Sequence, residues 1–221
     1  MDRASSESVA IAVFSRAPVP GQAKTRLIPS LGAEGAASLQ QAFLRRTLHT
    51  ALSARLGPVS LWCAPDCTHA DFQQCRIDFD IPLYSQCDGD LGTRMFAVFA
   101  QLCAKNPVLL IGTDCPALTC EHLRLAATAL REGNDAVFLP AEDGGYVLAG
   151  LRRAETCVFT GMPWGSADVM AETRRRLQQC SMDWLEPVLL WDVDGPEDIA
   201  RLRSSGLLRE WFGEHKYLRT G

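Results

Sequence analysis

The sequence predicts an α/β fold with a mostly parallel sheet. Short apolar runs of strand length alternate along the chain with longer segments whose apolar residues recur at helical spacing. Polar, acidic or glycine-rich segments directly follow four of the apolar runs. Ligands of such folds bind at the carboxyl ends of the strands, so we expect a binding site along one edge of the sheet.

The strands are predicted from short apolar runs that glycine, proline or polar residues bound. The first, VAIAVFS, is continuously apolar, as in a strand that is buried on both faces. PVSLWC is the second, and a short third one precedes the segment QCDGD. The later runs end at GTDCP, AEDGGY or DVDGPED, or form the segment GYVLAGL. The predicted strands are residues 9–15, 58–63, 81–85, 108–111, 135–140, 145–151 and 188–191.

The helices are predicted from apolar residues that fall on one side of a helix. In the first helix these are Leu39, Phe43, Leu48 and Leu52, and the later helices have similar stripes. Thr119 is expected to cap the helix that follows it. The predicted helices are residues 33–56, 91–105, 120–132, 166–179 and 196–204.

Length and composition favour a single domain. The chain has 221 residues, of which 47% are hydrophobic and 22% are charged, as in soluble globular domains. Residues 1–221 are expected to form this domain, with residues 1–8 and 213–221 as peripheral tails. The net charge of −4 is not that of a protein that coats DNA or RNA, so any anionic ligand must meet a local cluster of cations.

Targeting signals and cysteine usage favour the cytoplasm. The apolar run at residues 9–14 is too short to span a membrane, and we expect no signal peptide, because residues 1–8 are polar. The nine cysteines are odd in number and scattered, without a Cys-x-x-Cys pair. We therefore expect free thiols and no zinc site in a cytoplasmic protein.

The loop after the first strand is a candidate phosphate site. Two prolines stiffen it, and Gly21 lets backbone amides approach a ligand. Arg16, Lys24 and Arg26 supply three cations, which suit a diphosphate or triphosphate and are expected to be exposed. The glycine precedes the lysine by three residues, unlike in a Walker A loop. The alternative is a solvated loop with incidental charges.

Two acidic segments are candidate metal ligands. Asp114 directly follows a buried strand, and carboxylate oxygens are the ligands that Mg²⁺ and Mn²⁺ prefer. Its alternative role is a helix cap, for which Thr119 is better placed. Alternation along a strand puts Asp192 and Asp194 on one side, so that one of them could join Asp114. Asp194 could instead cap a helix that begins near Pro196.

Three further segments carry candidates for acceptor or anion binding. Asp143, beside Gly144 and Tyr146, could act as a base or hold a sugar hydroxyl, although a turn between two strands is the alternative. Trp164 could stack on a ligand ring or pack in the core. Arg94, where a helix opens, is an anion candidate.

Together these segments resemble a bacterial family of small glycosyltransferase-like proteins. The family has the GT-A fold of the nucleotide-diphospho-sugar transferase superfamily and is often encoded near radical-SAM proteins. The similarity extends from residue 14 to about residue 202. Its motifs, in order, are FSRAPVPGQAKTRL, GDLGTRM, IGTDCPAL, EDGGYVLAGL, MPWGS and WDVDGPEDIARL.

The resemblance implies a three-layer α/β/α domain with a nucleotide site at the carboxyl edge of the sheet. It assigns nucleotide phosphates to Gly21, Lys24 and Arg26, with Arg16 where the family has lysine. It makes Asp114 the metal-binding acid and Asp194 a second ligand of the metal or of the substrate, and it assigns the acceptor to Asp143, Gly144 and Tyr146. Asp114 and Asp143 are the predicted catalytic carboxylates, Arg94 a further phosphate ligand and Trp164 a further acceptor contact.

Three functions follow from these assignments. The first is a glycosyltransferase that uses a nucleotide-sugar donor, a small-molecule acceptor and Mg²⁺ or Mn²⁺. The second is a nucleotidyltransferase that transfers a nucleoside monophosphate from a triphosphate to a phosphorylated small molecule. The third is a nucleotide-binding module without catalysis. Stabilisation by a nucleoside diphosphate or by a triphosphate would distinguish the first two. No feature of the sequence fixes the oligomeric state.

Overall fold

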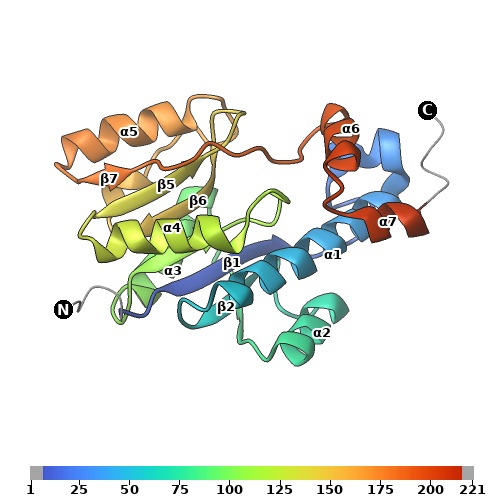
Figure 1. The fold of residues 1–221 in the computed structure, drawn as a ribbon, viewed down its shortest axis with the longest axis horizontal. Helices are drawn as coiled ribbons and strands as arrows, with labels where there is room; N and C mark the ends of the chain where they lie inside the picture. The colour runs from blue at the N-terminus through green and yellow to red at the C-terminus, as the bar shows by residue number, and fades with distance from the viewer. Residues whose placement is uncertain (1–6, 216–221) are drawn as a thin grey trace.

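The computed structural model describes residues 7–215, which form one seven-stranded sheet between helices (Figure 1). The strand order is β3-β2-β1-β4-β6-β5-β7. The strands are β1 (Ala10–Arg16), β2 (Val59–Ala64), β3 (Leu83–Ser85), β4 (Val108–Ile111), β5 (Ala136–Pro140), β6 (Tyr146–Leu151) and β7 (Trp184–Leu185).

Only β6 runs antiparallel to its neighbours, as the prediction of a mostly parallel sheet requires. β1 pairs in parallel with both β2 and β4, in registers that place Phe14 beside Trp62 and Val13 beside Ile111. The short loop at residues 141–145 joins β5 directly to β6, so these two strands form an antiparallel pair. The carboxyl ends of β1, β4 and β5 therefore point to the same edge.

Helices cover both faces of the sheet and confirm the three-layer α/β/α prediction (Figure 1). Apolar residues of α1, α2 and α4 pack on one face, and those of α3 and α5 pack on the other. A third cluster joins the first half of α1 to α6 and α7. The helices are α1 (Ile28–Ala54), α2 (Ala70–Phe79), α3 (Leu91–Leu102), α4 (Cys120–Arg131), α5 (Val169–Gln179), α6 (Pro196–Ser205) and α7 (Arg209–Glu214), with short 3-10 turns η2 (Thr25–Leu27) and η3 (Thr156–Val158).

The predicted strand at residues 188–191 is wrong. In that segment only Leu190 forms a bridge, to Ala141, and the last strand is β7, four residues earlier. Pro187 removes an amide donor at the point where the segment leaves the sheet edge. The segment then crosses to α6 with the Leu189 side chain exposed.

Three helices differ most from the sequence prediction, while α3 ends three residues earlier and α5 begins three residues later than expected. α1 begins at Ile28, five residues earlier than expected, and Gly32 interrupts it with a φ of 70°. α2 and α7 were not predicted. α2 buries only Phe72 and Cys75, so its apolar pattern is too weak to mark a helix.

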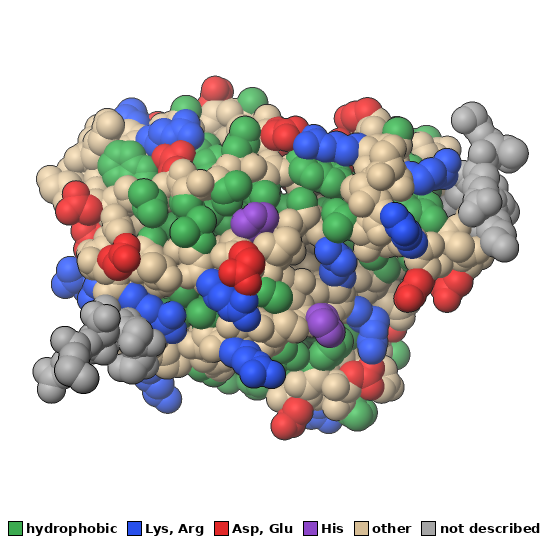
Figure 2. All heavy atoms as spheres, viewed as in Figure 1, with side chains coloured by type: hydrophobic (Ala, Val, Ile, Leu, Met, Phe, Trp, Pro, Cys, Tyr) green, Lys and Arg blue, Asp and Glu red, His purple; other side chains and the backbone are tan. Residues whose placement is uncertain are grey.

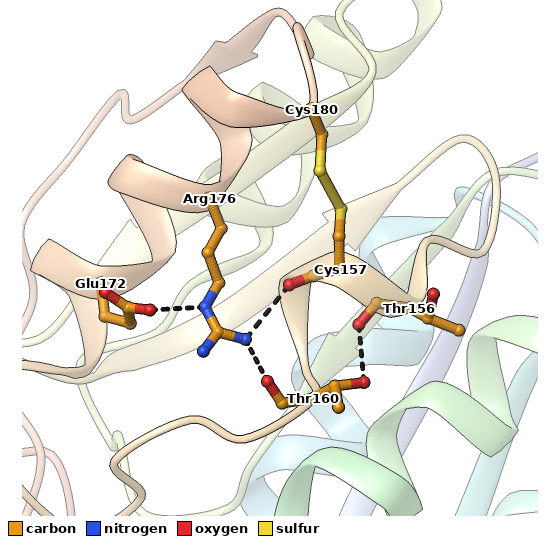
Figure 3. The surroundings of a disulfide bond; sticks show 6 residues. All are labelled: Thr156, Cys157, Thr160, Glu172, Arg176 and Cys180. Atoms are coloured by element: carbon orange, nitrogen blue, oxygen red, sulfur yellow. Dashed lines mark hydrogen bonds and ion pairs between the residues drawn. A yellow bond between two sulfur atoms is a disulfide. The ribbon is translucent and has the colours of Figure 1, made fainter.

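The prediction of nine free thiols is also wrong, because Cys157 and Cys180 are joined in a disulfide (Figure 3). The other seven cysteines are free. The disulfide links η3 to the residue after α5, which lie 23 positions apart, so spacing alone could not reveal the pair. Arg176 supports the same contact by donating to the carbonyl oxygens of Cys157 and Thr160.

Figure 2 shows acidic and basic side chains interspersed over the viewed face, without a large area of one sign. No helix within residues 7–215 is long and apolar enough to cross a membrane. Of the predicted tails, residues 1–6 and 216–221 lie outside the described residues, whereas Gly213 and Glu214 belong to α7.

Candidate functional site

A cavity of about 600 Å³ opens at the carboxyl ends of β1 and β4. Its wall combines apolar residues, such as Phe14, Leu110 and Met95, with charged ones. The predicted site residues that line it are Arg16, Lys24, Arg26, Arg94, Asp114, Tyr146 and Asp194. Gly21, Asp143, Gly144 and Trp164 are not part of its wall. The structure thus brings most of the candidates from the two ends of the chain to one cavity.

Lys24 and Asp114, predicted as separate ligands, are paired. The Lys24 ammonium lies 2.8 Å from Asp114 Oδ1 and donates to the Val193 carbonyl at 2.6 Å. The lysine side chain is only 6% exposed and its ammonium lies 5.3 Å from the centre of the Phe43 ring, whereas the aspartate side chain is 47% exposed. The expectation that Lys24 is an exposed loop cation is therefore wrong. Its backbone has a left-handed φ of 48°, which turns the chain into η2.

The arginines around the cavity are less constrained. Arg26 is 74% exposed and reaches Asp194 at only 3.5 Å. Arg94 donates to the side chain of Gln86 and to the carbonyl of Asp90. Among the residues that the structure describes, neither Arg16 nor Arg94 has a carboxylate partner within 4 Å. These guanidinium groups are available to an anionic ligand.

Three carboxylates gather beside the cavity. Ligand oxygens of Asp143, Asp192 and Asp194 all lie within 4.8 Å of one another. Burial raises the pKa of Asp192 to about 6, and the nearby charges of Asp143, Asp194 and Asp114 add to the shift. Burial also raises the pKa of Asp194, although the positive charge of Lys24 counteracts part of this increase. Three mutually repelling carboxylates form a donor set that fits Mg²⁺ or Mn²⁺. Asp192, which the sequence offers as an alternative to Asp194, belongs to this group.

The backbone explains how these acids meet. The amide of Val193 donates to the Asp114 carbonyl at 2.9 Å, which ties the last crossing segment to the end of β4. Val193 itself is fully buried, so alternation turns Asp192 and Asp194 to the same side, as predicted. The alternative role of Asp194 as a helix cap is wrong. Asp198 accepts from the amides of Asp194 and Gly195 at the start of α6.

Of the four predicted acceptor residues, only Tyr146 lines the cavity, whereas Asp143, Gly144 and Trp164 lie outside its wall. Tyr146 packs edge-on against Phe138 and Trp164, and burial raises the pKa of its hydroxyl, so the phenol stays protonated. A side chain on Gly144 would collide with the Ala167 backbone, so this glycine lets two chain segments approach each other. Trp164 packs against Gly92 and Tyr146, and its buried indole nitrogen has no hydrogen-bond partner among residues 7–215.

Sequence reasoning missed two glutamines on the cavity wall. Gln86 follows β3 and holds Arg94, while Gln40 lies in the buried face of α1. A glutamine in an otherwise apolar helical stripe was the available signal for Gln40, because a buried amide must find hydrogen-bond partners. No comparable pattern marks Gln86 in the sequence.

The family profile described as "uncharacterized protein conserved in bacteria (DUF2064)" matches residues 47–166, more than half of the chain. The chain belongs to the DUF2064 family. Among curated proteins, none matches the sequence of this DUF2064 chain significantly.

Solved structures confirm the fold of this DUF2064 protein. A protein of Desulfovibrio desulfuricans G20, provisionally assigned as a nucleotide-diphospho-sugar transferase, is 27% identical with a TM-score of 0.83. The match covers 95% of this chain and 97% of that one. It confirms the resemblance to nucleotide-diphospho-sugar transferases and supports a transferase.

Two more distant structures share the fold alone. A cytidylyltransferase of Leptospira borgpetersenii is 12% identical with a TM-score of 0.58, and the match covers 96% of each chain. Glucosyl-3-phosphoglycerate synthase of Mycobacterium tuberculosis, solved with Mn²⁺, uridine diphosphate and glucosyl-3-phosphoglycerate, is 11% identical with a TM-score of 0.53. That match covers 95% of this chain and 80% of the synthase.

Proposed function

We propose that this protein is a nucleotide-dependent transferase that transfers a glycosyl group from a nucleotide-sugar donor to a small-molecule acceptor. The observation that carries the proposal is the meeting of arginines, Lys24 and three carboxylates in the wall of one cavity of about 600 Å³, with Asp143 beside two of them. Such a cavity suits a nucleotide, and the charges suit its phosphates and a divalent cation. The likeness to the Desulfovibrio protein supports the same class.

The cations of the β1 loop would bind the donor phosphates. Arg16 and Arg26 are exposed and can reach an anion without losing a buried partner. Lys24 is fixed by Asp114 and Val193, so it would act from a preset position at the floor of the phosphate site. Positive groups placed beforehand beside a leaving diphosphate stabilise the charge that develops on it.

Asp143, Asp192 and Asp194 would hold the divalent cation, with Asp114 as a further carboxylate close to them. A bound Mg²⁺ or Mn²⁺ would supply additional positive charge at the phosphates of the donor. On the acceptor side, Asp143 is exposed, and the carboxylate oxygen that does not bind the cation could accept a proton from an attacking hydroxyl. Tyr146 keeps its proton and could donate a hydrogen bond at the same wall.

Nucleotidyl transfer is the second candidate, because the fold is shared with a cytidylyltransferase. The two activities differ in the nucleotide that the resting enzyme holds. A glycosyltransferase binds a nucleoside diphosphate or its sugar, whereas a nucleotidyltransferase binds an intact triphosphate. A thermal-shift panel of nucleoside diphosphates, diphospho-sugars and triphosphates, each with and without Mn²⁺, separates them by which class raises the melting temperature.

The binding of a divalent cation by these carboxylates can be tested separately. Calorimetry with Mn²⁺ and the best nucleotide of the panel should show that each ligand strengthens the binding of the other. Asp192→Asn and Asp114→Asn each remove one carboxylate while keeping the shape. The control is Asp80→Asn, an exposed aspartate at the end of α2 in a left-handed conformation that asparagine tolerates. If no nucleotide binds the wild-type protein, the proposed function is wrong.

A further inference from the structure

Three buried polar side chains in the cavity wall are joined by hydrogen bonds. Ser15, Gln40 and Thr113 are 3%, 4% and 4% exposed, and all three line the cavity wall. The Gln40 amide nitrogen donates to Ser15 Oγ at 3.2 Å and to Thr113 Oγ1 at 3.0 Å. Gln40 thus connects the carboxyl ends of β1 and β4 from the helix that packs over them.

The direction of these hydrogen bonds follows from the other contact that each hydroxyl makes. Ser15 Oγ donates to the Arg16 carbonyl at 3.1 Å, and Thr113 Oγ1 donates to Asp114 Oδ1 at 3.4 Å. A hydroxyl has a single hydrogen, so each one that donates onward must accept from Gln40. An amide nitrogen with two hydrogens fits both contacts. Each hydroxyl also directly precedes a candidate ligand residue, Arg16 or Asp114.

Packing alone does not account for a glutamine at this position. Its neighbours on the same face of α1 are Ala36, Ala37, Phe43 and Leu44, which are all buried and apolar. An aliphatic side chain there would fill the space without desolvating an amide. The second contact between α1 and this loop comes from Arg46, which donates to the Pro116 carbonyl at 3.0 Å. The helix therefore holds the loop on both sides of Asp114.

We propose that Gln40 is a positioning residue for Asp114. Its amide nitrogen holds the Thr113 hydroxyl so that the hydrogen of this hydroxyl points to Asp114 Oδ1, the oxygen that faces Lys24. The carboxylate is thereby kept in one orientation beside the phosphate and metal site. This role rests on the proposed function, because it matters for activity only if Asp114 and Lys24 serve a nucleotide.

Two variants break the chain of hydrogen bonds at different points. Gln40→Met keeps the length and removes both donors, and Thr113→Val keeps the shape and removes the hydroxyl. We expect each to weaken the binding of inorganic pyrophosphate with Mn²⁺ about 10-fold, as groups that orient ligands through a second residue do. The double variant should bind no more than about 2-fold more weakly than either single one, because both changes remove the same contact. Thr113→Ser restores the hydroxyl and should bind like the wild type.

The matched control is Gln41→Met in the same helix. Gln41 is exposed and donates to Asp71 at 2.6 Å, away from the cavity, so its loss should leave pyrophosphate binding unchanged. Thr47→Val is the control for stability, since Thr47 is a buried polar residue of the same helix that does not line the cavity. Wild-type affinity in both Gln40→Met and Thr113→Val would overturn the proposal.

A crystal structure of the Gln40→Met protein separates this proposal from the proposed function. We expect the Asp114 carboxylate to rotate, so that the 2.8 Å contact of Oδ1 with Lys24 is lost. An unchanged contact would overturn the positioning role, whether or not the protein binds nucleotides. If Gln40→Met does not fold, the structure of Thr113→Val answers the same question. Failure of wild-type protein to bind any nucleotide would count against the proposed function alone.

Discussion

The ammonium of Lys24 lies 2.8 Å from the carboxylate of Asp114 and joins the loop after β1 to the end of β4. The two residues differ in burial, with 6% of the lysine side chain and 47% of the aspartate side chain exposed. The buried ammonium needs the carboxylate to compensate its charge, whereas water can solvate the half-exposed carboxylate without the ammonium. The pair is therefore part of the fold as well as of the candidate site, and its two halves are not equivalent.

We predict that Asp114→Asn lowers the free energy of unfolding more than Lys24→Met does. The asparagine leaves a buried ammonium with one carbonyl partner, whereas the methionine leaves a carboxylate that water can reach. We expect the free energy of unfolding to fall by about 2 kcal/mol in Asp114→Asn and by at most about 1 kcal/mol in Lys24→Met. Both values lie below the range for fully buried ion pairs. Urea unfolding at pH 7 of both variants gives the order, and equal or reversed costs would contradict it.

We predict that Arg26→Ala changes binding without changing stability. Its pair with Asp194 spans 3.5 Å and its side chain is 74% exposed, so the free energy of unfolding should change by less than about 0.5 kcal/mol. The affinity for a nucleoside diphosphate should fall about 5-fold at low salt, and less at 0.5 M NaCl because salt screens exposed charges. Calorimetry at the two salt concentrations tests this, with Arg55→Ala, at the far end of α1, as the control.

The sequence contains most of the fold because the central strands are short, apolar and bounded by breakers. β1, β4 and β6 begin and end within one residue of the prediction. The last strand was misplaced because VLLW is apolar enough for a strand, although only one of its residues pairs with the sheet. The pattern of apolar residues indicates only that a segment is buried. A segment that crosses the edge of a sheet can be partly buried without forming the hydrogen bonds of a strand.

The site was predicted segment by segment, but the pairing of its members was not. Chain order places Lys24 and Asp114 ninety positions apart, and only the parallel pairing of β1 with β4 brings their loops together. The same holds for Asp143 and Asp192, whose segments meet where Glu142 bonds to Leu190. Residue types can suggest a phosphate or a metal, but which acid neutralises which cation depends on tertiary contacts.

We predict that Asp192→Asn stabilises the protein at pH 7 and not at pH 4. The pKa of Asp192 is raised from 3.8 to about 6, so the folded state binds this proton more tightly than the unfolded state does. Its contribution to stability is therefore fully present below pH 4 and is lost as the pH rises through about 6. Two pKa units correspond to about 3 kcal/mol, which solvent screening of a half-buried group reduces to about 1 kcal/mol.

Urea unfolding of wild type and Asp192→Asn between pH 4 and pH 8 measures this effect. The difference in the free energy of unfolding should grow from zero to about 1 kcal/mol across that range. Saturating Mn²⁺ should stabilise the wild type and reduce the difference, since the cation relieves the same repulsion. A constant difference at all pH values would show that the Asp192 carboxylate is not responsible.

The last prediction concerns Gly144 and uses Gly21 as its matched comparison. Both glycines have positive φ, at 92° and 80°, and both belong to loops beside the cavity. They differ in surroundings, because a Cβ on Gly144 would collide with the Ala167 backbone, whereas nothing lies within 4 Å of a Cβ on Gly21. Gly144 also accepts from the Met170 amide at 2.8 Å, which fixes this loop to the start of α5.

Gly144→Ala must therefore move one of two backbone segments, and we expect it to cost about 3 kcal/mol. Gly21→Ala meets only the conformational cost of a left-handed residue, about 1 kcal/mol. Displacing the loop also shifts Asp143 away from Asp192 and Asp194, so Mn²⁺ affinity should fall in Gly144→Ala and stay unchanged in Gly21→Ala. Urea unfolding and Mn²⁺ calorimetry on the two proteins test both parts. Equal losses of stability would mean that the backbone around Ala167, just before α5, can move at little cost. Unchanged Mn²⁺ binding in Gly144→Ala would exclude Asp143 from the metal site.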